Sequence, residues 1–162
     1  MKQQSPTAQL NGFLARFTPE IAAAAKRVLA TMRARTPGAI EFVYDNYYAL
    51  VIGFGPNERP SDAIFSVVVR PKWVSVCFLQ AGTDMPDPHG LLRGSGNLVR
   101  HIRLADPSDL DKPAVRALIA TALTRADPRL NPASRRRVII RAVSPRALPR
   151  RPATRPRRAR AT

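Results

Sequence analysis

Four apolar runs rich in β-branched and aromatic residues follow one another between residues 40 and 80, and short polar segments separate them. The runs cover residues 40–44, 49–54, 63–69 and 73–80. This composition is typical of β-strands. Residues 70–72 form a turn that is too short for a crossover connection, so the last two runs are predicted to form an antiparallel hairpin. The chain must therefore fold around a β-sheet.

Three helices are expected beside the sheet, because apolar residues recur at helical spacing in three places. The apolar stripes are Leu10, Phe13, Leu14 and Phe17; Ile21, Ala25, Val28, Leu29 and Met32; and Val115, Leu118, Ile119, Ala122 and Leu123. Thr18 and Pro19 favour the start of the second helix, because a hydroxyl caps a helix and proline suits its first position. Pro37 ends this helix. Asp109 or Asp111 is expected to cap the third helix.

Two further strands are predicted at residues 98–104 and 138–143. Together these elements predict an α+β domain, a twisted and mostly antiparallel sheet of about five or six strands with helices packed on one face. The 162 residues of the chain fit a single hydrophobic core. We expect this domain to occupy residues 1–143.

The positive charge is concentrated towards the C-terminal end of the chain. Residues 1–127 contain 15 Lys and Arg against 11 Asp and Glu, a net charge of +4, whereas residues 128–162 contain 12 Arg and no acidic residue. Apolar residues become rare after Ser144. Residues 144–162 are therefore expected to be a disordered tail rich in arginine and proline.

This tail has two interpretations. It can be a polyanion-binding segment that contacts the phosphates of nucleic acid without sequence preference. The candidate contacts are Arg150, Arg151, Arg155, Arg157, Arg158 and Arg160. Alternatively, the tail is a solvated extension that keeps the protein soluble.

The glycine-rich segment Arg93, Gly94, Ser95, Gly96 and Asn97 is a candidate ligand-binding loop. The backbone amides of such a turn can point at one phosphate or carboxylate, and Arg93, Arg100 or Arg103 would supply the countercharge. The segment lacks the Lys-Ser/Thr ending of a nucleotide-binding P-loop. The alternative, which we favour, is a tight turn that leads into the strand at residues 98–104.

A second candidate ligand surface contains Glu41, Tyr44 and Tyr47. Tyrosine side chains between two strands can line a cleft, with the carboxylate of Glu41 or Asp45 orienting a polar group. Ordinary packing of half-buried tyrosines at a sheet edge is the favoured alternative. The single tryptophan, Trp73, is either a core residue or an exposed aromatic group on the hairpin.

Metal and catalytic sites have weaker support in the sequence. His89 and His101 lie near Asp84 and Asp87, but their spacing matches no strong metal-binding signature. Ser95 and His101 lack the motif of a nucleophile elbow. The only cysteine, Cys77, lies in an apolar run and is expected to be a core thiol. We therefore predict no metal, no cofactor and no catalytic residue.

Residues 41–47, 53–56, 90–96 and 138–141 (EFVYDNY, GFGP, GLLRGSG and VIIR) together resemble the bacterial YdhG-like family, over roughly residues 8–143. The resemblance implies a frataxin-like α+β fold, and it brings no set of catalytic residues. Some relatives in the wider group are described as iron chaperones that collect cations on an acidic helix. Here the helix at residues 18–36 has one acidic residue, Glu20, against Lys26, Arg27, Arg33 and Arg35, so the iron function is not carried over.

Three functional hypotheses follow. The first is a non-enzymatic module that binds a small ligand or a protein partner near Glu41, Tyr44 and the glycine-rich loop. The second is a protein that associates with nucleic acid through its basic tail. The third is an enzyme that acts on a small anion at the glycine-rich loop. We expect a cytoplasmic protein without a membrane anchor, because no run approaches the length of a membrane span and the chain starts without a signal-peptide pattern.

Overall fold

The computed structural model describes residues 3–153. Within this range the chain forms three α-helices, two short 3₁₀ helices and six strands. The helices are α1 (Pro6–Leu14), α2 (Pro19–Arg35) and α3 (Pro113–Arg125), with η1 (Pro60–Asp62) and η2 (Pro107–Asp111). The strands are β1 (Ile40–Asp45), β2 (Leu50–Gly55), β3 (Phe65–Val69), β4 (Val74–Phe78), β5 (Arg100–Leu104) and β6 (Arg137–Val143).

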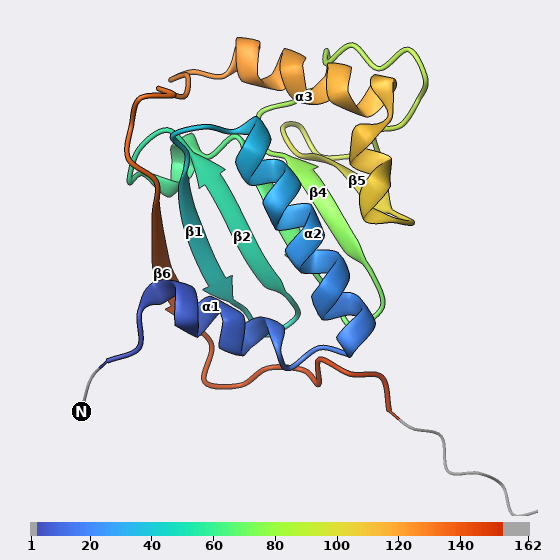
Figure 1. The fold of residues 1–162 in the computed structure, drawn as a ribbon. Coiled ribbons are helices and arrows are strands. Elements are labelled where there is room, and N and C mark those ends of the chain that lie inside the picture. Colours follow the sequence, from blue (N-terminus) through green and yellow to red (C-terminus); the bar gives the residue numbers. More distant parts are fainter. Residues whose placement is uncertain (1–2, 154–162) are drawn as a thin grey trace, which may run out of the picture.

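The six strands form one sheet in the order β5-β4-β3-β2-β1-β6 (Figure 1). Neighbouring strands from β1 to β5 are antiparallel, which confirms the hairpin predicted from the turn at residues 70–72, and β6 pairs parallel with β1 at the opposite edge. The predicted α+β fold with a mostly antiparallel sheet of five or six strands is therefore confirmed.

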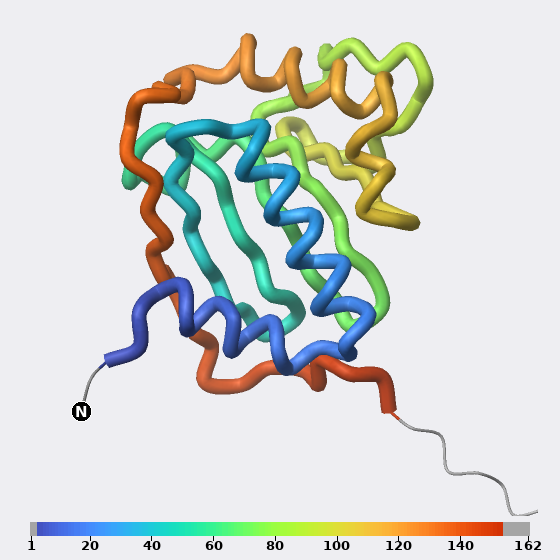
Figure 2. Tube along the Cα trace, in the orientation of Figure 1, coloured from blue at the N-terminus to red at the C-terminus, as the bar shows by residue number. Residues whose placement is uncertain are grey.

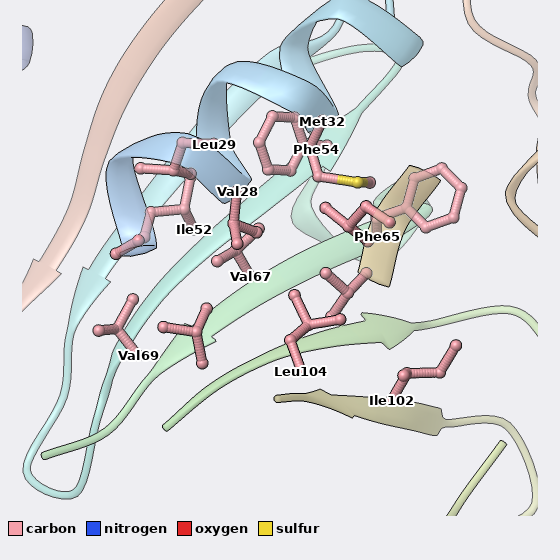
Figure 3. Packing of buried hydrophobic residues seen from close by; sticks show 14 of the residues in the cluster. Val28, Leu29, Met32, Ile52, Phe54, Phe65, Val67, Val69, Ile102 and Leu104 are labelled. Carbon is pink, nitrogen blue, oxygen red and sulfur yellow. The ribbon is translucent and has the colours of Figure 1, made fainter. Parts of the chain in front are cut away.

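One face of the sheet forms the hydrophobic core with the helices. Strand pairing aligns Val43, Ile52, Val67, Val76 and Ile102 in one row across five strands, and all five are buried. Helix α2 runs across this face and α1 crosses its end (Figure 1). Figure 3 shows side chains of α2 interlocking with those of β2 and β3. These residues share one face because alternate residues of a strand point the same way.

The other face, called here the open face, contains the intervening residues. One row is Tyr44, Val51, Val68, Ser75 and Arg103, and the next is Phe42, Gly53, Ser66, Cys77 and His101. Within the second row, the ring of Phe42 lies over Gly53 and Gly55, where added side chains would contact it. In the first row Tyr44, Val51 and Val68 are only half-buried and lie outside the hydrophobic core cluster.

The start of α3 differs from the sequence expectation. Asp109 and Asp111 belong to η2, where Asp106 and Asp109 form a capping box, and neither caps α3. Helix α3 instead begins at Pro113, because proline has no N–H to donate and its fixed φ suits the first helical position. Lys112 precedes it, and none of the described side chains caps this helix.

The segment after β6 also differs from the expectation, because part of it packs against the domain (Figure 2). The Ser144 amide donates to the Asp45 carbonyl at 2.8 Å, and the Leu148 amide donates to the Tyr47 carbonyl at 2.8 Å. Arg150 is 5% exposed and pairs with the Asp45 carboxylate. Ordered contacts therefore continue past the predicted boundary at residue 144.

The remaining predicted tail residues Arg155, Arg157, Arg158 and Arg160 lie outside the described part of the chain. Among the helices that are described, none is both long enough and apolar enough to cross a membrane.

Candidate functional site

The two predicted ligand surfaces do not meet. Glu41, Tyr44 and Tyr47 lie on β1 or the turn after it, whereas the glycine-rich loop precedes β5. Strands β2, β3 and β4 lie between β1 and β5. With a strand spacing of about 4.8 Å, the two strands are about 19 Å apart. The two groups of residues are therefore too far apart to line a common cleft.

Glu41 is already neutralised inside the fold. Its carboxylate is buried and accepts three hydrogen bonds of 2.8–3.1 Å from the guanidinium of Arg33 on α2. Arg136 approaches the same carboxylate at 3.8 Å. Both of its oxygens are occupied, so Glu41 connects α2 and the segment before β6 to β1. The buried Glu41 carboxylate therefore takes part in ion pairs within the fold.

The tyrosines of this region occupy different surroundings. Tyr44 is half-buried on the open face, as an outward-pointing strand residue is expected to be. Tyr47 and Tyr48 are exposed in the turn between β1 and β2, with ring centroids 4.8 Å apart in an edge-to-face arrangement. This geometry is common for aromatic pairs. Tyr47 and Tyr48 therefore form a small exposed aromatic patch.

The glycine-rich loop is a turn held by its own backbone. Arg93 and His101 exchange two backbone hydrogen bonds of 2.8 and 2.9 Å, which close the loop. Gly94 has a φ of +117°, a backbone conformation that residues other than glycine rarely adopt. The Arg100 guanidinium donates to the carbonyls of Gly96 and Val99. Ser95 and Asn97 are exposed.

The Asp87 carboxylate also supports local structure. Its two oxygens accept the amides of Leu91 and Leu92 at 2.9 Å each. The cavity that Asp87 and His89 line contains neither Ser95 nor His101. Within residues 3–153, no three side chains of His, Cys, Asp or Glu form a group that could hold a metal ion.

An apolar cavity of about 380 Å³ lies between the segment around Asp87 and helix α3. Most of its lining is apolar, and its polar residues are Asp87, His89 and Thr121. The apolar residues are Pro86, Pro88, Leu91, Pro113, Ala114, Ala117 and Leu118. A mostly apolar cavity of this size with a few polar groups is typical of small-molecule sites.

A second cavity of about 240 Å³ adjoins the first and is basic. Leu91 lines both cavities, and Lys112 of the second precedes Pro113 of the first in the chain. The remaining lining residues of the second cavity are Arg93, Ile102, Arg103, Asp109 and Val115. Three cations therefore share this cavity with one carboxylate. The two cavities together have an apolar part and a cationic part.

The basic cavity contains more positive than negative charge. Lys112 forms an ion pair with Asp109 at 3.1 Å. Burial would raise the pKa of Asp109, but hydrogen bonds from Lys112 and from the amides of Asp106 and Ala105 bring it below its usual value. Asp109 therefore stays ionised and neutralises one cation. Among the described residues, the Arg93 guanidinium donates only to the Gly90 carbonyl, and the Arg103 guanidinium lies 4.0 Å from the centroid of the Trp73 ring. The cavity keeps an excess of positive charge.

The N-terminus of α3 adds to this positive potential. Residues of its first turn line both cavities, Pro113 and Ala114 the apolar one and Val115 the basic one. The first N–H groups of a helix have no partner within the helix, and no side chain caps α3. A helix N-terminus carries a partial positive charge that favours anions.

The sequence analysis identified one part of this site and missed the rest. It named Arg93 and Arg103 as sources of countercharge, and both line the basic cavity. It missed Lys112 and Ala117, because these cavities form only where α3 packs beside β5 and the segment around Asp87. The signal that marks the true start of α3 is Pro113, since proline favours the first helical position.

No protein-family model, no curated protein and no solved structure matches this chain, so these comparisons assign it to no family. The resemblance to the YdhG-like family therefore remains a prediction. The candidate site is interpreted from its geometry and charge.

Proposed function

We propose that this protein is a non-enzymatic binding module for a small organic anion with an apolar body. The observation that carries the proposal is the adjacency of the apolar cavity and the basic cavity, which share Leu91. The apolar cavity receives the hydrocarbon or aromatic part of the ligand. The basic cavity receives its carboxylate, sulfonate or phosphate group.

The cations and the helix support this assignment of the polar group. Arg93 has no carboxylate partner among the described residues, and its planar guanidinium suits a carboxylate or phosphate. Uncapped amides at the start of α3 offer further donors. A neutral apolar molecule would leave these donors unused. The preferred ligand is therefore an anion.

The proposal is tested by calorimetric titration of the full chain with 8-anilinonaphthalene-1-sulfonate, an aromatic anion. N-phenyl-1-naphthylamine, which lacks the sulfonate, serves as the neutral comparison. We expect the anion to bind more tightly. Losing a hydrogen bond to a charged group costs about 1.5–3 kcal/mol, so Arg93→Gln should weaken binding of the anion about tenfold or more.

Matched variants distinguish binding in the two cavities from non-specific binding of the probe elsewhere on the protein. Ala117→Leu places a larger side chain in the apolar cavity, whereas Ala120→Leu makes the same change on α3 at an exposed position outside the cavity lining. Arg141→Gln, on β6 at the opposite sheet edge, is the control for charge loss. We expect Ala117→Leu to weaken binding and both controls to leave it unchanged. Equal affinity of all variants would refute the proposal.

A further inference from the structure

A second surface with a distinct chemistry lies on the open face of the sheet. The first row of this face runs through Tyr44, Val51, Val68, Ser75 and Arg103. Its apolar members are half-buried, and the described helix layer packs on the opposite face (Figure 1). Neither row of the open face contains an acidic residue. Both rows are thus free of negative charge, and the half-buried side chains of the first row, together with the exposed Arg103, are the accessible part of the face.

Planar cationic and aromatic groups gather at one end of this face. The half-buried ring of Trp73 has the Arg103 guanidinium 4.0 Å and the Arg70 guanidinium 5.8 Å from its centroid. Neither arginine forms an ion pair with a described acidic residue. Both guanidinium groups therefore lie over the Trp73 ring while their positive charge remains available. Stacked arginine and aromatic planes are surfaces on which unpaired bases stack.

The charge of the described chain suits a polyanionic partner. Residues 3–153 contain 22 Lys and Arg and 11 Asp and Glu, a net charge of +11. Nine of these basic residues form the ion pairs found within this range. Much of the positive charge is therefore not neutralised by the fold. Phosphates are the natural complement of such an excess.

We propose that the open face binds single-stranded nucleic acid, with bases stacking along Tyr44 and the Trp73 group and phosphates contacting Arg70 and Arg103. A single strand fits better than a duplex, because a flat face with stacked planes contacts the faces of bases, which a duplex hides. Arg103 borders both this face and the basic cavity, whereas Tyr44 and Arg70 line neither cavity, so variants of Tyr44 and Arg70 test the face alone.

The test measures fluorescence anisotropy of a labelled single strand of about 12 nucleotides, within the usual range of site sizes, with the full-length protein. The same strand annealed to its complement is the comparison. Arg70→Gln and Tyr44→Leu remove one cation and one ring from the face. Arg116→Gln removes one exposed cation from α3 and is the matched control. Circular dichroism and melting curves establish that each variant is folded.

We expect the single strand to bind more tightly than the duplex and to change the emission of Trp73, the only tryptophan. Arg70→Gln and Tyr44→Leu should each weaken binding about fivefold or more, while Arg116→Gln has little effect. Binding of the sulfonate probe should stay unchanged in both face variants, which separates this inference from the proposed function. Should Tyr44→Leu fail to fold, Arg70→Gln alone decides. Equal binding of the duplex, or equal losses in Arg70→Gln and Arg116→Gln, would overturn the proposal.

Discussion

At the scale of single residues, Asp45 is a buried charge on which several segments converge. Its carboxylate accepts from Arg16 and from Arg150 at 3.0 Å each. Arg150 is itself buried, with its guanidinium 5.7 Å from the Phe17 ring centroid, and its Nε and Nη1 atoms have no hydrogen-bond partner within residues 3–153. A buried pair is costly to break, because the remaining charge loses its compensation. The pair therefore fixes the segment after β6 to the end of the sheet.

The replacement Arg150→Ala should lower the free energy of unfolding by about 2–4 kcal/mol, because the buried Asp45 keeps only the more exposed Arg16. Urea unfolding measures the change. Arg146→Ala removes an exposed arginine from the same segment and should change stability by less than about 0.5 kcal/mol. Indistinguishable urea midpoints for the two variants would show that the segment does not dock in solution.

Gly94 and Gly96 provide a matched pair within the glycine-rich loop. Gly94 has a positive φ, and an added Cβ would lie 3.3 Å from the Val99 carbonyl oxygen, whereas Gly96 has open space around it. Gly94→Ala should therefore destabilise the domain by about 1–2 kcal/mol, and Gly96→Ala should be close to neutral. Thermal unfolding of both variants checks this. A larger loss for Gly96→Ala would contradict the loop geometry.

Cys77 should produce a small decline in stability at alkaline pH. Burial raises the pKa of its thiol, more than the Ser66 hydrogen bond and the Arg70 charge lower it. As pH rises, the unfolded chain loses this proton before the folded chain does, so stability is complete below the ordinary thiol pKa and declines above it. Urea unfolding at several alkaline pH values measures the slope. Cys77→Ala should flatten the slope, and an unchanged slope would exclude the thiol as its cause.

At the scale of elements, the spacing of apolar residues and the turn residues predicted most strands and helices. They did not predict which strand pairs with β6 or where α3 begins. The short turn around Pro71 made the antiparallel hairpin of β3 and β4 predictable. The pairing of β6 with β1 was not predictable, because the long connection from α3 permits either sheet edge. The start of α3 was missed, because aspartates that looked like its caps belong to η2.

At the uncapped start of α3, one substitution should raise the stability of the protein and weaken its binding of an anion. Lys112 has extended backbone angles, φ −60° and ψ 134°, which suit a capping residue. Lys112→Ser should therefore stabilise the protein by about 0.5–1 kcal/mol. The same change removes a cation from the basic cavity and should weaken binding of the anilinonaphthalene sulfonate. Urea unfolding and calorimetry measure the two effects. A stabilised variant with undiminished affinity would remove Lys112 from the proposed site.

At the scale of the whole molecule, the sheet separates regions of different chemistry. Helices α1 and α2 cover one face, and the open face presents aromatic and basic groups. Helix α3 and the segment around Asp87 line the two adjacent cavities. The sequence indicated the excess of charge and the cations Arg93 and Arg103. It could not indicate that they share a cavity with Lys112, because that depends on how α3 packs beside β5.

The most direct test of the proposed function is an NMR titration of the isotope-labelled full chain with 8-anilinonaphthalene-1-sulfonate. The account requires saturable amide shift changes that concentrate at residues 86–93, 102–103 and 109–121, which carry the lining of both cavities. These changes should be much smaller with the neutral N-phenyl-1-naphthylamine. Shift changes centred instead on the exposed Tyr48 or Leu98, or equal changes with the neutral compound, would contradict it.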